Sequence, residues 1–173
     1  MKLFHLSDLH IGKRVNEFSM IEDQKYILTQ ILYAADQEKP DGILISGDVY
    51  DRTIPTAEAV QVFDAFLTRL SEQKIPAFII SGNHDSAERL AFGSSLMGKS
   101  GIYFSKVYDR TVEKIPMQDA YGTVWIYLLP FLRPSTIRHA LPRCSLRRTL
   151  CGLRWSRPKS MRRSGMCFLR TSL

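Results

Sequence analysis

The sequence predicts an α/β fold built around a parallel sheet. Three short apolar runs, at residues 2–7, 43–46 and 77–80, have the length and composition of buried strands. Two segments with helical periodicity separate them, and the connections are short. Strands that alternate with helices in this way are typical of parallel sheets with helical crossovers. Such sheets bind ligands at the carboxyl ends of their strands, so the residues that follow each run are the candidates for a functional site.

The first helix is expected to begin near Ser19. Ser19 and Glu22 have the spacing of a capping box, in which each residue satisfies a free amide of the other. An apolar stripe with helical period follows, formed by Ile21, Ile27, Leu28, Ile31, Leu32 and Ala35. The sequence Lys-Pro-Asp-Gly at 39–42 is expected to end this helix.

The remaining elements follow from the same patterns. A second helix is expected over residues 56–72, with one apolar face formed by Val60, Phe63, Leu67 and Leu70. A short helix is expected within 86–100. Short strands are expected at 102–104 and 111–115, and a turn at 119–122 precedes the β-prone segment 123–129.

The composition of the chain changes near residue 137. All 17 acidic residues precede this point, whereas residues 138–173 carry nine Arg, one Lys and all three Cys. The net charge of +7 therefore belongs to the tail and does not indicate that the body binds nucleic acid. Two interpretations of the tail stand: a disordered, basic nucleic-acid-binding segment, or the product of a frameshift, which we favour. We accordingly divide the chain into a domain at 1–137 and a tail at 138–173.

The cellular location is predicted from what the sequence lacks. No apolar run approaches the roughly 20 residues that a membrane-spanning helix needs. The N-terminus does not have the layout of a signal peptide, because His5 and Asp8 interrupt its apolar region. We therefore expect a cytoplasmic protein without a membrane partner. Because His5 lies inside the first predicted strand, we expect its side chain to pack into the core.

Polar side chains follow all three predicted strands. Asp8 and His10 come after the first strand, Asp48 after the second, and a Gly-Asn-His-Asp cluster occupies 82–85 after the third. An Asp-x-His pair or a Gly-Asp turn alone is common by chance. Three such clusters in order at three successive strand ends are not, and they indicate a metal-dependent active site.

The residue types in these clusters suit a particular chemistry. Asp8 and His10 can bind one ion, Asp48 can reach the same ion or bridge to a second, and Asn83 supplies an amide oxygen. Such mixed ligands suit Mn²⁺, Fe²⁺ or Zn²⁺. Two ions about 4 Å apart can activate water and stabilise an in-line phosphoryl displacement. His84 would then stabilise the developing charge or assist the leaving oxygen, and we expect Asp85 to orient the His84 ring.

The three clusters resemble the first three motifs of the calcineurin-like metallophosphoesterases. Longer stretches at 7–13, 47–51 and 130–134, the last being Pro-Phe-Leu-Arg-Pro, are similar to the SbcD-type nuclease subunits within that superfamily. The resemblance covers residues 1 to about 137. It implies the N-terminal part of a calcineurin-like sandwich, in which β-sheets are flanked by helices, in an incomplete form.

The resemblance also implies an activity and partners. It implies a nuclease with two divalent metal ions, Mn²⁺ in preference, that acts on DNA as a 3′→5′ exonuclease on duplex ends and as an endonuclease on single strands and hairpins. A homodimer within a heterotetramer with an SbcC-type, SMC-like ATPase is implied as well. Asp8 and His10 would bind the first ion, Asp48 would bridge, Asn83 would bind the second, and His84 would be the catalytic histidine.

The sequence departs from the family pattern in one respect. The family has further metal-binding histidines in Gly-His and Gly-His-x-His motifs, and this chain contains no Gly-His pair. We therefore expect a truncated chain with weak or no nuclease activity and with one side of its core exposed. The alternatives are a small-substrate phosphoesterase, a non-catalytic binding scaffold, and nucleic-acid binding by the tail.

Overall fold

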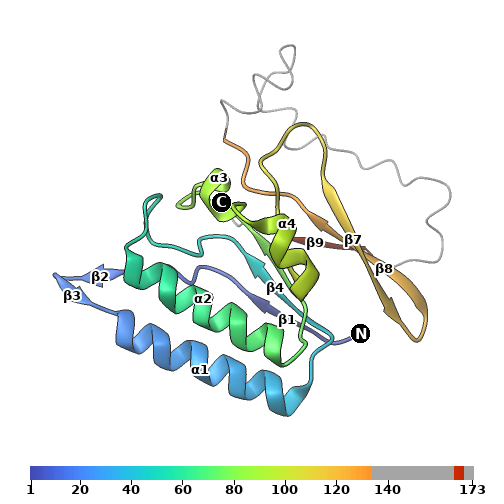
Figure 1. Cartoon of the computed structure of the whole chain (residues 1–173), viewed down its shortest axis with the longest axis horizontal. Helices are drawn as coiled ribbons and strands as arrows, with labels where there is room; N and C mark the ends of the chain where they lie inside the picture. The colour runs from blue at the N-terminus through green and yellow to red at the C-terminus, as the bar shows by residue number, and fades with distance from the viewer. Residues whose placement is uncertain (134–165, 170–173) are drawn as a thin grey trace.

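A computed structural model, which describes residues 1–133 and 166–169, confirms a mixed α/β fold with a parallel central sheet (Figure 1). The central sheet has the strand order β1-β4-β5-β6, and its neighbouring strands are all parallel. Its strands are β1 (Leu3–Leu6), β4 (Gly42–Ser46), β5 (Ala77–Ile80) and β6 (Ile102–Phe104). The three apolar runs predicted as strands thus lie side by side in one sheet, with β4 between β1 and β5.

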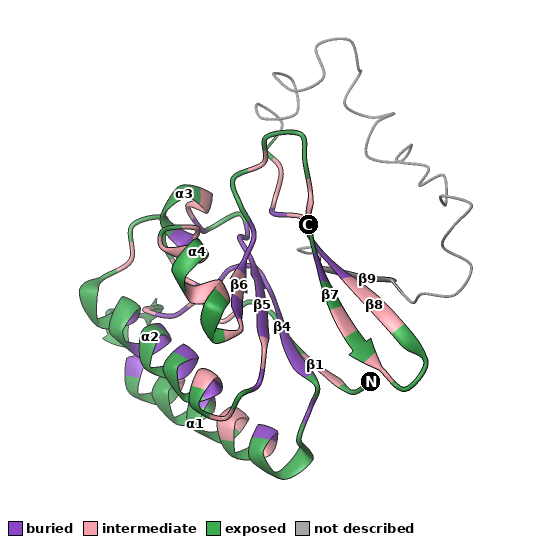
Figure 2. Ribbon diagram, turned by 45° about the vertical axis from the view of Figure 1, so that its right-hand side comes forward, coloured by how far each residue is buried: buried purple, intermediate pink, exposed green. Residues whose placement is uncertain are grey.

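Helices α1 (Ile21–Glu38) and α2 (Ala57–Glu72) cover one face of this sheet, and a second sheet lies against the other (Figures 1 and 2). The second sheet consists of β7 (Glu113–Asp119), β8 (Gly122–Leu128) and β9 (Met166–Leu169). Strands β7 and β8 are antiparallel, as the predicted turn between them requires, and β9 runs parallel to β8.

Strands β4 and β5 are buried on both faces because their side chains alternate between two apolar clusters. Ile43, Ile45 and Ile79 pack with the helices. Leu44, Phe78 and Ile80 pack with Ile115, Ile126 and Leu128 of the second sheet. The expectation that one side of the core would be exposed is therefore wrong for these two strands, since the β7–β8 hairpin covers that side.

The start of α1 differs from the prediction. The N-cap residue is Met20, which makes no side-chain capping bond, so Ser19 and Glu22 do not form a capping box. Instead, Ser19 Oγ accepts a hydrogen bond from the Ile21 N–H at 3.4 Å. The preceding loop also contains a small hairpin of β2 (Arg14–Val15) and β3 (Phe18–Ser19), whose two-residue strands are too short to give an alternating pattern.

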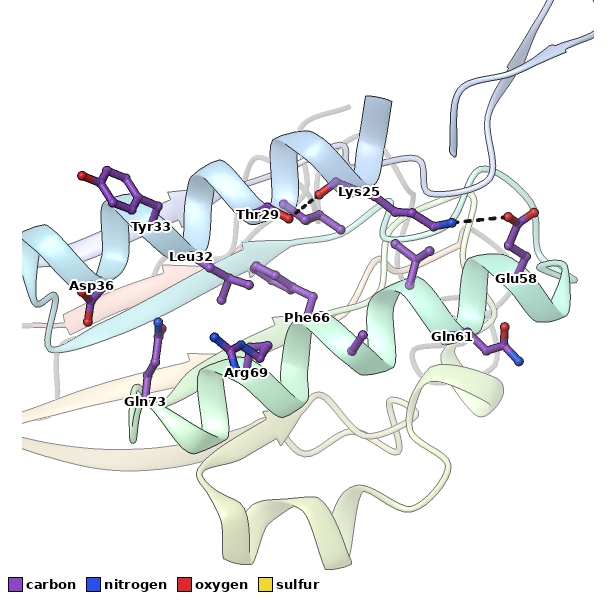
Figure 3. Close-up of a pocket in the computed structure, with 13 residues that line it drawn as sticks. Lys25, Thr29, Leu32, Tyr33, Asp36, Glu58, Gln61, Phe66, Arg69 and Gln73 are labelled. Carbon is purple, nitrogen blue, oxygen red and sulfur yellow. Dashed lines mark hydrogen bonds and ion pairs between the residues drawn. The ribbon is translucent and has the colours of Figure 1, made fainter. Parts of the chain in front are cut away.

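Helix α2 begins as expected, because the Thr56 hydroxyl accepts the Ala59 N–H at 3.2 Å. Its buried face is rotated from the predicted one, and Val60 is 42% exposed. The buried residues are Ala59, Val62, Phe63, Phe66, Leu67 and Leu70. A groove of about 890 Å³ runs between α1 and α2, and the Lys25 ammonium lies 3.6 Å from the Glu58 carboxylate across it (Figure 3).

Two further predictions need correction. The helix expected within 86–100 is divided into α3 (Ala87–Leu90), α4 (Ser94–Met97) and the 3₁₀ turn η1 (Gly98–Ser100), with Gly93 at a φ of 75° between the first two. His5 is exposed rather than packed in the core, and its Nε2 lies 2.6 Å from Ser46 Oγ. In the described part of the chain, β1 lies at the edge of its sheet, so its side chains are covered less than those of β4.

Most of the predicted tail, including His139 and two of its three cysteines, lies outside the described residues. Within the tail, only β9 is described, and it extends the second sheet. Among the residues placed by the structure, no helix is long and apolar enough to cross a membrane.

Candidate metal centre

The candidate site is formed where β1 and β4 end. These strands pair in parallel, with Leu6 beside Ile45, so the loops that follow them leave the sheet at adjacent positions. Asp8 and His10 lie in the first loop and Asp48 in the second. One ligand atom from each of these three residues lies within 4.8 Å of the other two. The structure therefore brings together three of the side chains that the sequence pattern predicted to share a metal site.

Backbone hydrogen bonds continue the pairing of β1 and β4 into these loops. The N–H groups of Asp8, His10 and Ile11 donate to the carbonyl groups of Gly47, Asp48 and Val49, at 3.2, 2.9 and 2.9 Å. The two loops therefore form one unit, and the ligands of one loop are fixed relative to the ligand of the other.

All three candidate ligands have a left-handed backbone. The φ angles are 56° at Asp8, 43° at His10 and 48° at Asp48. This conformation costs a residue with a side chain on the order of 1 kcal/mol, and such strain persists where surrounding contacts enforce it, commonly at functional sites. Among the residues that the structure describes, eight non-glycine residues have a positive φ, and three of these are the candidate ligands. The strain at these three positions supports a functional role for the two loops.

The His10 ring lies between two carboxylates. Its Nε2 is 4.0 Å from Asp8 Oδ1, and its Nδ1 is 3.6 Å from Asp51 Oδ1, which is too long for a hydrogen bond. This Nδ1 is buried and has no hydrogen-bond partner within the described ranges. A divalent ion beside Nε2 fits this arrangement, because metal-bound histidines commonly direct the other ring nitrogen toward a carboxylate.

The chemistry of the donor set also fits a divalent metal. Two carboxylates and an imidazole are ligands for Mn²⁺, Fe²⁺ or Zn²⁺. With bonds of about 2.1 Å, donor atoms on opposite sides of one ion are about 4.2 Å apart. The observed spread of up to 4.8 Å would thus close by a small side-chain adjustment.

Asp48, in the loop after β4, contacts the Gly-Asn-His-Asp cluster at 82–85. Its side chain is buried, and Oδ1 accepts the His84 N–H at 3.0 Å. Gly82 lies so close to Asp48 that a Cβ atom on Gly82 would be 2.1 Å from Asp48 Oδ1. Only glycine therefore permits this approach, which explains the first residue of the Gly-Asn-His-Asp cluster in terms of space.

The His84 ring lies beside the three candidate ligands. It makes an edge-to-face contact with the His10 ring, with 4.8 Å between the centroids. Its Nδ1 lies 3.0 Å from the backbone carbonyl oxygen of Asp51. A carbonyl can only accept, so Nδ1 carries the proton and the neutral ring has its lone pair on Nε2. That nitrogen can then interact with a substrate.

Asp85 does not orient His84 as expected. Its carboxylate is buried and accepts three backbone N–H groups, those of Val49 at 3.1 Å, Tyr50 at 3.0 Å and Gly82 at 2.8 Å. Burial raises the pKa of Asp85 above its ordinary value, although these N–H groups act in the opposite direction. Asp85 thus joins the loop after β4 to the loop after β5, and the group that orients His84 is the Asp51 carbonyl.

Two residues of the site were not predicted from the sequence. Asp51 contacts both histidines, through its carboxylate and its carbonyl group. Gln24 of α1 hydrogen-bonds to the loop that carries Asp8 and His10. The sequence offered one signal for Gln24: it is a polar residue that stands between Ile21 and Leu28, two buried residues of the helical stripe. Asn83 is exposed beside His84, and its role as a ligand stays a prediction.

The sequence of the chain is similar to sequences of known proteins. The family of calcineurin-like phosphoesterases matches residues 1–143. An SbcD subunit of the SbcCD nuclease from Staphylococcus epidermidis is 37% identical over 140 residues, which are 80% of this chain and 36% of that protein. The corresponding SbcD subunit from Staphylococcus saprophyticus is 38% identical over 132 residues, or 76% of this chain and 34% of that protein. The chain thus spans about a third of the length of these relatives.

Proposed function

The chain belongs to the calcineurin-like phosphoesterase family. We propose that its metal centre hydrolyses phosphodiester bonds in DNA. The observation that carries the proposal is the convergence of Asp8, His10 and Asp48 within 4.8 Å, with the His84 backbone hydrogen-bonded to Asp48. Two relatives named as nuclease subunits support a nucleic acid as the substrate, and the resemblance to SbcD-type subunits favours DNA.

We assign the individual roles as follows. Asp8 and His10 would hold a first ion, Asn83 would hold a second, and Asp48 would be a ligand of both. Divalent ions held in this way supply an activated water and neutralise charge on the phosphate. His84 contacts the substrate through Nε2, because the Asp51 carbonyl occupies Nδ1. Asp85 holds the loops after β4 and β5 together.

The metal, the extent of the domain and the partners belong to the same proposal. We propose Mn²⁺ as the ion and a nuclease portion that extends to about residue 137. An SbcC-type ATPase is a proposed partner because the named relatives are SbcD subunits of an SbcCD nuclease. A second copy of this chain is proposed from the resemblance to SbcD-type subunits alone. The chain has no Gly-His pair to supply the further histidines that the family resemblance implies, so we expect it to show weak or no hydrolysis of DNA.

The test is hydrolysis of labelled DNA by the 173-residue chain with MnCl₂. A blunt duplex and a hairpin are compared with bis-p-nitrophenyl phosphate, because the DNA substrates distinguish a nuclease from a small-substrate phosphoesterase. Asp48→Ala should abolish the cleavage, and Asp41→Ala, in an exposed residue before β4, should not. Hydrolysis of the small ester alone would overturn the nuclease assignment. The absence of both Mn²⁺ binding and hydrolysis would favour a non-catalytic scaffold.

A further inference from the structure

Gln24 joins helix α1 to the loop that carries two of the candidate metal ligands. Its Nε2 donates hydrogen bonds to the carbonyl oxygens of Leu9, at 3.2 Å, and His10, at 2.7 Å. Its Oε1 accepts the N–H of Gly12 at 2.9 Å. One side chain, 12 to 15 residues away in the sequence, thus satisfies three backbone groups of a single turn.

Gln24 and the loop after β4 bind different backbone groups of this turn. The N–H groups of Asp8, His10 and Ile11 are bound by the loop after β4. The carbonyl groups of Leu9 and His10 are bound by Gln24. The turn is therefore held by two neighbours. The loop after β4 binds three N–H groups and the Ile11 carbonyl, and Gln24 binds two carbonyl groups and the Gly12 N–H.

The turn needs this support because its backbone is strained. Asp8 and His10 have φ angles of 56° and 43°, and the order of 1 kcal/mol that each costs must be offset by local contacts. Gln24 itself is well anchored. The helix stripe places it between Ile21 and Leu28, both of which are buried in the core.

We propose that Gln24 is a positioning residue for the metal centre, which it serves by holding the backbone of the Asp8–His10 turn in its ligand-presenting conformation. This inference rests on the proposed function, in that it assumes a divalent ion at Asp8, His10 and Asp48. The side chain must be an amide, because the task requires a donor for two carbonyl groups and an acceptor for one N–H group.

The chemical requirement distinguishes two substitutions. In Gln24→Leu, the Leu9 carbonyl and the Gly12 N–H lose the partner that Gln24 supplies, and the His10 carbonyl keeps only the Lys13 N–H, at 3.0 Å. In Gln24→Glu, the shape is kept and Gly12 retains an acceptor, but the carboxylate cannot donate to the two carbonyl oxygens and is repelled by them. A new negative charge near a cation would by itself strengthen binding. Weaker binding by Gln24→Glu would therefore report geometry rather than charge.

The experiment titrates the wild-type chain and both variants with MnCl₂ by calorimetry and with CoCl₂ by visible absorption, which reports the ligand set of the ion. Gln30→Glu is the matched control, because Gln30 is an exposed residue of the same helix. Both Gln24 variants should bind Mn²⁺ about tenfold more weakly or worse and show an altered Co²⁺ spectrum. Their circular dichroism without metal should be native, and Gln30→Glu should match the wild type.

The outcomes separate the two proposals. Unchanged Mn²⁺ affinity and Co²⁺ spectra in both Gln24 variants, with Asp48→Ala defective, would overturn the role of Gln24 alone. Loss of the native circular dichroism in both Gln24 variants without metal would also overturn it, since Gln24 would then serve the fold rather than the site. A wild-type chain that binds no Mn²⁺, or an Asp48→Ala variant that binds it equally well, would overturn the proposed metal centre itself.

Discussion

Asp8 combines a strained backbone with an exposed side chain. Its φ angle is 56°, its side chain is 52% exposed, and its carboxylate lies no closer than 4.0 Å to the His10 ring nitrogen Nε2. Little stability therefore depends on the side chain when metal is absent. Glycine adopts this backbone conformation without strain, although it also loses more conformational entropy on folding.

We predict that Asp8→Gly stabilises the metal-free chain while it removes a ligand. The relief of strain should exceed the entropic cost by about 0.5 kcal/mol, and thermal denaturation in EDTA should show a slightly higher midpoint. Asp23→Gly, in the first turn of α1, should lower the midpoint because its backbone is helical. A lower midpoint for Asp8→Gly as well would show that the turn is not strained.

Gly82 is the residue at which a single methyl group should disable the site. A Cβ atom there would lie 2.1 Å from Asp48 Oδ1 and 2.2 Å from the Asp48 backbone nitrogen, so one loop must move. Gly82→Ala should lose Mn²⁺ binding in calorimetry and about 1–3 kcal/mol of stability. Gly98→Ala should be tolerated, because its Cβ would meet its nearest neighbours at 3.9 Å.

Tyr50 should make the free energy of unfolding fall as the pH rises in the alkaline range. Burial chiefly raises its pKa to about 12, with smaller contributions from the charges of Asp85 and Asp64. Because the folded state favours the neutral phenol, stability is complete below the ordinary pKa near 10 and is lost as the pH rises toward 12. The denaturation midpoint should fall less steeply between pH 10 and 12 in Tyr50→Phe than in the wild type. Equal slopes would contradict the shift.

At the scale of elements, the strands and long helices follow from the sequence, but their contacts do not. Apolar runs predicted β4 and β5 because both are buried on both faces, and the helical period predicted α1 and α2. The helical period did not predict correctly which face of α2 is buried, since Val60 is exposed and Phe66 is buried. The helix near residue 93 was not predicted to break, although a glycine at a φ of 75° stands there.

In the candidate site, too, the sequence predicted the main residues but not all of their contacts. Asp8, His10 and Asp48 were predicted to converge because adjacent parallel strands end together, and they do. The contacts of Asp51 and Gln24 were not predicted, because they involve backbone carbonyl groups that no residue pattern encodes. For the same reason, the expected pairing of Asp85 with His84 was wrong.

Helix α2 should supply much of the stability of the helical layer. Leu70 is fully buried near its C-terminal end. Leu70→Ala should lower the free energy of unfolding by about 2–5 kcal/mol, as measured by urea denaturation. Thr68→Ala, at an exposed position of the same helix, should change it by less than about 0.5 kcal/mol. Similar effects of the two substitutions would show that α2 does not pack on the sheet as described.

At the scale of the whole molecule, metal binding should stabilise the fold, because the site joins loops that follow separate strands. At a concentration about 100 times the dissociation constant, an ion adds about 2.7 kcal/mol. For a chain of this size, the thermal midpoint should rise by about 5–10 °C. Differential scanning calorimetry with MnCl₂ or EDTA measures this shift. Asp48→Ala should show none, and a wild-type midpoint that does not respond to MnCl₂ would contradict the proposed centre.

The position of the site within the sequence has a consequence for synthesis on the ribosome. Asp8, His10, Asp48 and His84, together with Gln24 and Asp85, all lie within the first 85 residues. The hairpin that covers Leu44, Phe78 and Ile80 ends only at residue 128. We infer that a growing chain can assemble its metal ligands while one face of the sheet is still bare. The interval before that hairpin emerges is therefore the stage at which a nascent chain would most depend on a chaperone.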